Sequence, residues 1–542
     1  MDSIPITRSI LLISSQMHTH CVIGSGPAGV AAASALLARG MSVLMLDAGI
    51  ELEPDRAKIV AALAKTKLSD WPSSQIAAVH GDSDADLKGL PHKKLFGSDF
   101  LYRESEDKIP WRARDVALRP SLGFGGLSNV WGATMLPLRE SDITDWPITR
   151  ADLDEHYRAA AQITGYAARR DGLEELFPLH SPNPVALKTS RQAARVLENL
   201  ERRRDQLRVR GWDFGQARLA IRAADSPRGL GCVYCGYCLT GCVYGCIFNA
   251  ADTVRELQRQ NNFRYERNVI VTRLRENSGG VSIEGFHRET GQPLAFEGRR
   301  VYLGAGVIPT AQIVLRSQNA FDQPLLLRDS QYFLFPILLA RRVRDVDTEA
   351  LYTLSQVFLE LANPQISRRS VHLQIYTYSQ TIAGSVRRSL GPLKFLSRSI
   401  QERLLVVQGY LHSDESPSIR MTLKRDGQKD FLQLEPVLNP ETPPTIRKVL
   451  RELMKQCRAL GGIVVPPMLQ IAGPGRGFHC GGSLPMRAQP AALQSDCLGR
   501  PAGWSRIHVV DASVLPTVPA TTITFSVMAN AHRIAWQSSQ MD

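Results

Sequence analysis

The chain of 542 residues lacks the long apolar runs that cross a membrane. Hydrophobic residues make up 44% of it, yet no stretch approaches the about 18 to 20 consecutive apolar residues that a membrane-spanning helix needs. The N-terminal apolar patch from Ile10 to Ile13 comes after Asp2 and Arg8, and no small-residue cleavage site follows it. We therefore expect no transmembrane span and no secretory signal, and we favour a cytoplasmic location.

A concentrated basic stripe is also lacking. The formal net charge of +13 suits phosphates, acidic sugars or an anionic membrane surface as partners. The basic residues are scattered, however, and the short clusters at 202–204 and 368–369 form no stripe with interleaved aromatic residues. We expect no nucleic-acid partner. No internal repeat is present, and the length favours two domains over one compact core.

Residues 20–47 have the order of strand, tight turn, helix and strand that a dinucleotide-binding unit requires. Gly24 permits the turn, Gly26 lets the backbone approach a pyrophosphate, and Gly29 lets the helix lie close to the strand. Asp47 ends the second strand, where a carboxylate accepts hydrogen bonds from ribose hydroxyls. A glycine-rich turn that binds nothing would leave this acid unexplained. The pattern predicts a dinucleotide site without separating FAD from NAD, and we assign to it Gly24, Gly26, Pro27, Ala28, Gly29, Asp47 and Ala48.

A second part of the nucleotide domain is indicated far downstream. The stretch from Asn268 to Leu274 alternates as a strand, and a β-ribbon follows it. Residues 300–315 then pass through a glycine-rich turn into a helix. We expect the nucleotide domain to be assembled from distant pieces, with Val271, Gly304 and Ala305 at the cofactor.

Three motif segments together resemble the glucose-methanol-choline family of flavin oxidoreductases. Besides the N-terminal fingerprint, the segment Gly123-Phe-Gly-Gly-Leu-Ser-Asn-Val-Trp-Gly132 is similar to the family's Gly-Gly-Ser-x-Asn-x-Trp segment, which runs beside the flavin. Asp142 and Trp146-Pro147 follow as in relatives, and the stretch 507–517 precedes an expected closing helix at 521–535. The resemblance spans residues 20–535, with the middle third matching least. It implies FAD as the cofactor, and as further cofactor-binding residues Gly125, Gly126, Ser128, Asn129, Trp131, Asp511, Ala512, Thr522 and Ile523.

The start of the expected closing helix has a physical reading of its own. Unpaired N–H groups and the positive dipole end at residues 521–524 would stabilise the negative charge that a reduced flavin carries near N1. An ordinary threonine-capped helix would use the same residues, so the pattern alone does not decide between the two.

The segment from Phe478 to Met486 is similar to the family's His-x-x-Gly-Thr segment, which would place His479 facing flavin N5. A histidine titrates near neutrality and therefore suits removal of a hydroxyl proton while hydride leaves the carbinol carbon. Taken alone, a histidine beside glycines is more often structural. Relatives usually carry a second His or Asn where this chain has Thr522, whose hydroxyl donates only one hydrogen bond. We take His479 and Thr522 as the catalytic candidates.

Five of the nine cysteines fall between Cys232 and Cys246. Their spacing approaches a bacterial ferredoxin run, and some bacterial sugar dehydrogenases of the same family carry a three-iron cluster at a similar place. Such a cluster would make the enzyme a dehydrogenase rather than an oxidase. A structural zinc ion and the absence of any metal remain alternatives. The candidate ligands are Cys232, Cys235, Cys238 and Cys242.

The expected fold class is α/β, with a Rossmann-like FAD-binding domain assembled from discontinuous segments and an antiparallel-sheet (α+β) substrate domain. The expected boundaries are 17–165, 245–325 and 466–542 for the FAD-binding domain, 166–244 for a lid or cysteine-rich insertion, and 326–465 for the substrate domain, with one helix at 444–460.

The resemblance implies an oxidoreductase that removes hydride from the CH–OH group of an alcohol or sugar-like substrate. Electrons would pass from FAD to oxygen, a quinone or a redox protein. A lyase that keeps FAD without redox chemistry and an FAD-binding protein without activity are the alternatives.

Overall fold

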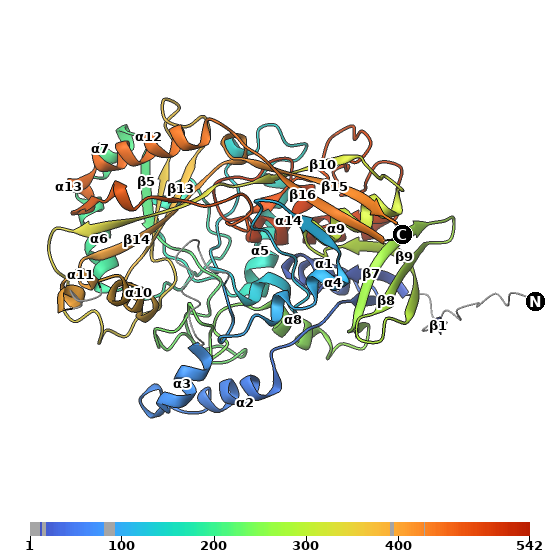
Figure 1. The fold of residues 1–542 in the computed structure, drawn as a ribbon, viewed down its shortest axis with the longest axis horizontal. Coiled ribbons are helices and arrows are strands. Elements are labelled where there is room, and N and C mark those ends of the chain that lie inside the picture. The colour runs from blue at the N-terminus through green and yellow to red at the C-terminus, as the bar shows by residue number, and fades with distance from the viewer. Residues whose placement is uncertain (1–10, 13–17, 81–92, 391–394, 428, 542) are drawn as a thin grey trace, which may run out of the picture.

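The fold is taken from a computed structural model, which describes residues 11–12, 18–80, 93–390, 395–427 and 429–541. Ile10 and Ile13 of the N-terminal patch and the first residue of the expected FAD-binding domain lie outside these ranges. Figure 1 shows two large regions, one built around a mostly parallel sheet near the two termini and one around an antiparallel sheet at the far end. None of the helices in the described ranges combines the length and the apolar character that a bilayer crossing needs.

The first region is an eight-stranded sheet. Strands from distant parts of the chain pair in parallel at its centre, where β2 lies between β3 and β9 and where β20 also pairs with β9. An antiparallel ribbon of β7, β8 and β9 completes it. The strands are β1 (Leu11–Leu12), β2 (His18–Ile23), β3 (Val43–Leu46), β6 (Phe263–Glu266), β7 (Val269–Glu276), β8 (Val281–His287), β9 (Pro293–Leu303) and β20 (Ile507–Val509). The predicted assembly of the nucleotide domain from separate segments is confirmed.

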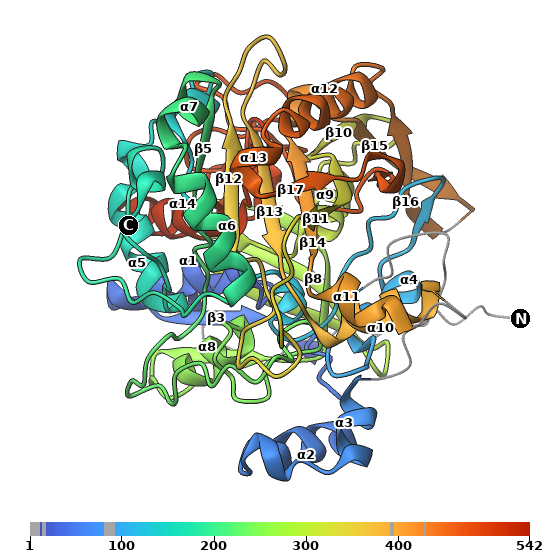
Figure 2. The ribbon, with the colours of Figure 1, turned by 90° about the vertical axis from the view of Figure 1, so that its left-hand side faces the viewer.

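Two buried helices pack together against this sheet. Helix α1 (Pro27–Ala38) is rich in alanine and buried along most of its length, and it packs against α14 (Thr524–Ser538). Helix α14 in turn packs against α5 (Ala151–Thr164). Helices that are apolar on all sides need such complete burial. Also in this region are α4 (Ser105–Lys108), α8 (Ala250–Leu257) and α9 (Val307–Ser317), while α2 (Pro54–Leu63) and α3 (Ser73–His80) project from the body in Figures 1 and 2.

The second region is a seven-stranded sheet whose pairs are all antiparallel. One face packs against helices through an aliphatic and aromatic core, and the other face looks toward the first region. The strands are β5 (Trp212–Gln216), β11 (Tyr332–Leu339), β12 (Val357–Leu361), β13 (Val371–Tyr376), β14 (Leu404–Leu411), β17 (Gly462–Val464) and β18 (Gln470–Ile471). The helices are α6 (Arg191–Glu201), α7 (Arg204–Val209), α10 (Gln380–Leu390), α11 (Ser397–Gln401), α12 (Thr442–Met454) and α13 (Cys457–Leu460).

A third sheet has five strands, which come from well-separated parts of the sequence. It pairs β4 with β16 in parallel and the remaining strands antiparallel. Its strands are β4 (Trp111–Ala113), β10 (Pro324–Asp329), β15 (Ser418–Asp426), β16 (Lys429–Val437) and β19 (Cys480–Gly481). Because β19 follows His479 directly, this sheet fixes the backbone of the candidate base.

Three details differ from the expectations. The helix expected at 444–460 is two helices, α12 and α13, because Lys455 and Gln456 end the first one. Helices α10 and α11 were not foreseen in a stretch interpreted as strands. The segment at 166–244 supplies β5, which pairs with β12, because its Trp212 and Phe214 join the apolar core of the antiparallel sheet.

The turn between β2 and α1 is sterically tight. Gly24 has a φ of 99°, a conformation that side chains disfavour. A Cβ added at Gly29 would lie 1.9 Å from the carbonyl oxygen of Gly24, so α1 touches the turn at this point. A Cβ at Gly26 would meet nothing within 4 Å. The space beside Gly26 is therefore open for a ligand.

This difference between two glycines gives a matched test. The change Gly29→Ala should lower the free energy of unfolding by about 1 to 3 kcal/mol, because backbone must shift to admit the methyl group. The change Gly26→Ala should leave the stability of the cofactor-free protein unchanged and weaken FAD binding. Thermal unfolding of the cofactor-free variants and FAD content after purification are the measurements. Equal loss of stability in both variants would contradict the assignment.

Candidate cofactor and active site

A cavity of about 430 Å³ lies where the parallel sheet, the antiparallel sheet and the start of α14 meet. Its wall includes both Gly26 of the fingerprint turn and His479. A second hollow of about 450 Å³ shares Gly24, Asp47 and Ala305 with it and continues past Val271. Together they offer an extended surface that fits a dinucleotide.

Asp47 is held rigidly on the wall of both hollows. Its carboxylate accepts hydrogen bonds from Ser25 N at 3.1 Å, Ser25 Oγ at 2.8 Å and Tyr265 Oη at 3.1 Å. Burial raises the pKa of Asp47 to about 6, although these hydrogen bonds oppose the shift. Gly125 N also donates to Ser25 Oγ at 2.9 Å, so one hydroxyl links the fingerprint turn to the second glycine-rich segment.

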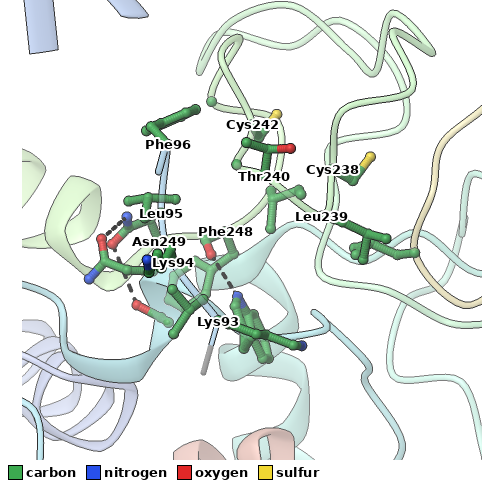
Figure 3. A pocket seen from close by; sticks show the side chains of 18 of the residues that line it. Lys93, Lys94, Leu95, Phe96, Cys238, Leu239, Thr240, Cys242, Phe248 and Asn249 are labelled. Atoms are coloured by element: carbon green, nitrogen blue, oxygen red, sulfur yellow. Dashed lines mark hydrogen bonds between the residues drawn. The ribbon is translucent and has the colours of Figure 1, made fainter. Parts of the chain in front are cut away.

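Side chains of the second glycine-rich segment bind protein rather than pointing freely into the cavity. Ser128 Oγ donates to Gly125 O at 2.6 Å and accepts from Ala250 N at 2.9 Å. Trp131 Nε1 donates to Phe248 O at 3.0 Å, and Figure 3 shows Phe248 with this bond. These bonds fix the loop, so its backbone and the indole ring are what line the cavity.

Asn129 is likewise engaged by protein. Its Nδ2 donates to Phe124 O at 2.9 Å and to Gly126 O at 2.8 Å, and its Oδ1 accepts from Asn249 Nδ2 at 2.8 Å. We expected Ser128 and Asn129 as cofactor contacts. Their hydrogen bonds instead give them a role in shaping the loop, and direct contact with a cofactor stays a prediction.

Asp511 holds the start of α9. Its Oδ2 accepts from Gly306 N at 2.9 Å and from Thr310 Oγ1 at 2.6 Å, and its Oδ1 accepts from Ser513 N at 2.9 Å. Burial raises its pKa despite these bonds. Asp511 and the adjoining Ala512 line the cavity, as do Gly304 and Ala305, so the C-terminal strand and the α9 turn meet the fingerprint turn there.

His479 borders the cavity deep inside the molecule. Its ring lies 4.7 Å from the ring of Tyr410. Its Nδ1 is buried and has no hydrogen-bond partner among the described residues. His479 as a whole is only partly buried, and it borders the cavity. The pKa of His479 is lowered to about 3, first by burial and then by electrostatic repulsion from the neighbouring His372 and Lys93 positions. The imidazole is therefore neutral at ordinary pH.

Thr522 also lines the cavity, but its hydroxyl proton is already engaged in a hydrogen bond within the protein. Its Oγ1 donates to Thr134 O at 3.1 Å, so the hydroxyl is left to accept a hydrogen bond. Helix α14 begins at Thr524, later than the expected start at Thr521. Thr522, Ile523 and Thr524 all border the cavity, so the helix N-terminus faces it.

Several cavity residues come from the antiparallel sheet and were not foreseen as site residues. They are Tyr332, Gln374, Tyr376, Gln408 and Tyr410. The signal in the sequence was the alternation of polar and apolar residues in 371–376, because a strand buried on both faces seldom carries three polar residues on one of them. Lys93 also borders the cavity, where burial lowers its pKa to about 8.

The cysteine-rich loop lies beside the cavity. Cys238 and Cys242 border a separate hollow that Figure 3 shows, and this hollow shares Trp131 with the main cavity. Cys246 N donates to Cys242 Sγ at 3.1 Å, and hydrogen bonds from Cys246 are the main cause that lowers the pKa of Cys242 to about 6. Burial raises the pKa of Cys232 to about 12 and that of Cys235 to about 11.

These thiols do not fit a metal site. Among the described residues, no group of three or more His, Cys, Asp or Glu side chains is arranged to hold a metal ion. The iron–sulfur cluster and the zinc ion considered for Cys232, Cys235, Cys238 and Cys242 are therefore without structural support.

Comparison with known proteins gives two likenesses, and no family model matches the chain. The chain is 24% identical over 327 residues to 6'''-hydroxyparomomycin C oxidase of Streptomyces lividus. The match covers 56% of this chain and 50% of that protein, so the chain spans about half the length of the curated relative. Among solved structures, pyridoxine 4-oxidase from Mesorbium loti superimposes with a TM-score of 0.57 at 15% identity, over 96% of this chain and 99% of that one.

Pyridoxine 4-oxidase is a flavoenzyme of the glucose-methanol-choline family, and the superposition extends over nearly the whole of the present chain. The resemblance drawn from the motif segments is thus confirmed, and the chain has the fold of the glucose-methanol-choline oxidoreductases.

Proposed function

We propose that the chain is an FAD-dependent oxidoreductase that removes hydride from the CH–OH group of an alcohol or sugar-like substrate, with His479 as the base. The observation that carries the proposal is a neutral imidazole in the wall of a cavity that the dinucleotide fingerprint also lines. The names of both similar proteins end in oxidase, which favours oxygen over a quinone or a redox protein as acceptor.

The residues present fit FAD. The open space beside Gly26 and the N-terminus of α1 suit the pyrophosphate, and Asp47 suits the ribose. The backbone around Gly125 and Gly126, the Trp131 ring and the start of α14 suit the flavin end. Bound FAD would supply the hydride acceptor.

The chain's own groups would then orient the alcohol and take its proton. His479 is neutral and can accept a proton from a hydroxyl within hydrogen-bond reach. The Tyr410 ring, tilted by 30° with its centroid 4.7 Å away, packs beside the imidazole. N–H groups at the start of α14 favour negative charge at the adjoining edge of the cavity. Thr522 can accept a hydrogen bond from the substrate but has no free proton to donate.

Replacement of the base tests the proposal directly. In His479→Ala, FAD content should be unchanged and the rate of flavin reduction by an alcohol should fall by about 10²- to 10⁴-fold, because a positioned base contributes on that order. The measurement is anaerobic stopped-flow bleaching of the flavin band with a panel of alcohols and sugars. His287→Ala, at the end of β8 and outside the cavity, is the control. If no alcohol or sugar bleaches the wild-type flavin, the lyase and the inactive FAD-binding protein become the better readings.

The pH profile provides a second test. A base acts in its unprotonated form, and a lowered pKa preserves that form as the pH falls. Because the pKa of His479 is lowered to about 3, the rate of flavin reduction should stay level from about pH 8 down to about pH 5. Single-turnover reduction measured across that range checks this expectation. A loss of rate with a midpoint near the ordinary histidine pKa would show that the imidazole is not buried in this way.

A further inference from the structure

One face of the antiparallel sheet carries a row of buried polar side chains. Strand register places Glu360 opposite His372, His372 opposite Tyr410, and Tyr410 opposite Tyr332. The row therefore crosses β12, β13, β14 and β11 in a line. It ends at the cavity, because the Tyr410 ring contacts His479 and Tyr332 lines the same wall.

A chain of three hydrogen bonds leads from this row into the cavity. Glu360 Oε1 lies 2.5 Å from His372 Nδ1. His372 Nε2 lies 3.1 Å from Gln374 Nε2. Tyr376 Oη donates to Gln374 Oε1 at 3.2 Å. Gln374 and Tyr376 line the cavity, whereas Glu360 and His372 lie beneath its surface with exposures of 1% and 0%.

With the Gln374 amide oriented as in the structure, one set of proton positions satisfies this chain with a carboxylate at its end. An amide nitrogen only donates, so Nε2 of His372 must accept from Gln374 and carry no proton. Nδ1 of His372 then holds the single ring proton and donates a hydrogen bond to Glu360. Burial raises the pKa of Tyr376, and a hydrogen bond with Ser355 offsets this rise only in part. The phenol therefore stays protonated and donates its hydrogen bond to Gln374. The Tyr376 oxygen is left as an acceptor.

Stability does not account for this chain of polar groups. Buried carboxylates cost free energy, and their replacement by well-packed apolar groups is often neutral or stabilising. Glu360 Oε2 is buried and has no partner among the described residues, so the carboxylate is not even fully satisfied. The opposite face of the same strands holds the sheet to its helices with apolar side chains alone.

We infer that Glu360, His372 and Gln374 form a positioning relay that fixes Tyr376 as a hydrogen-bond acceptor toward the substrate. This inference rests on the proposed function of the cavity. Tyr410 behaves in the same way, since its Oη donates to Gln408 Oε1 at 3.4 Å. Neither tyrosine therefore offers its proton to the substrate.

The relay defines a class of substrate. The group that meets Tyr376 must donate a hydrogen bond, so the substrate is an alcohol with a second hydroxyl or an amine close to the reacting carbinol. An ether at that position cannot donate to the phenol oxygen, which would then keep only its hydrogen bond with Ser355. Sites built to hydrogen-bond a hydroxyl reject analogues that lack it.

Matched pairs of alcohols test the inference on the FAD-loaded enzyme. The probes are cyclohexane-1,2-diol with 2-methoxycyclohexanol, and 2-hydroxybenzyl alcohol with 2-methoxybenzyl alcohol. Dissociation constants come from perturbation of the flavin spectrum, and reduction rates come from anaerobic bleaching. The wild type should bind the hydroxyl member of a pair about 10-fold more tightly than the ether, which is the size of one satisfied buried hydrogen bond.

Two variants separate positioning from a structural role. Tyr376→Phe should abolish the preference for the hydroxyl member while affinity for the ether is retained. Gln374→Met should lose the same preference, and the double variant should lose no more than either single one, because both act through one chain. Tyr378→Phe, the same chemical change just beyond the end of β13 and outside the cavity, is the control. FAD content and thermal unfolding show which variants are folded, and Tyr376→Phe decides alone if Gln374→Met is not.

The outcomes distinguish this inference from the proposed function. If alcohols reduce the flavin but the wild type binds both members of each pair equally, or neither member of any pair, the relay has no role in selection and the inference fails while the function stands. Retention of the preference in Tyr376→Phe overturns it equally. Failure of every alcohol and sugar to reduce the flavin overturns the proposed function instead.

Discussion

The contact between the Gly24 carbonyl and Gly29 is the constraint on which the rest of the site depends. It brings the first turn of α1 against the end of β2, so the helix N-terminus opens onto the cavity. Because α1 packs along α14, the same contact sets where α14 begins. The start of α14 is in turn the wall that faces His479 across the cavity. One missing side chain thus positions both helix termini that could meet a dinucleotide.

Several polar groups of the cavity wall are already bound to protein. Ser128 accepts a hydrogen bond from the start of α8, Asp511 binds the turn before α9, and the Thr522 hydroxyl donates to Thr134 O. Such bonds restrict side chains before any ligand arrives, and a preorganised site avoids the cost of ordering them later. His479 differs, since its Nδ1 is buried without a partner among the described residues. A buried titratable group without a partner in the wall of a cavity is where chemistry is to be expected.

The features encoded locally could be predicted from the sequence. The β2–α1 turn and the discontinuous nucleotide domain follow from glycine spacing and strand patterns, whereas the placement of His479 at the cavity rested on the family resemblance of its segment. What the side chains of Ser128 and Asn129 contact could not be predicted, because their partners lie about 120 residues away along the chain. The cavity-lining residues on β13 and β14 were not predicted for a similar reason, because cross-strand register decides which of them share a face. The short helices α10 and α11 were not predicted, because a few turns of helix give too weak a hydrophobic periodicity to recognise in the sequence.

The hydroxyl of Ser25 accepts a hydrogen bond from Gly125 N and donates one to Asp47. The carboxylate at position 47 and the second glycine-rich loop are therefore coupled through a single oxygen atom. A substitution at position 47 that changes nucleotide preference would also affect the second glycine-rich loop. Displacement of the carboxylate would disturb Ser25 and, through it, the loop that carries Trp131. Directed evolution of this scaffold toward another cofactor would have to change positions 25, 47 and 125 as one unit.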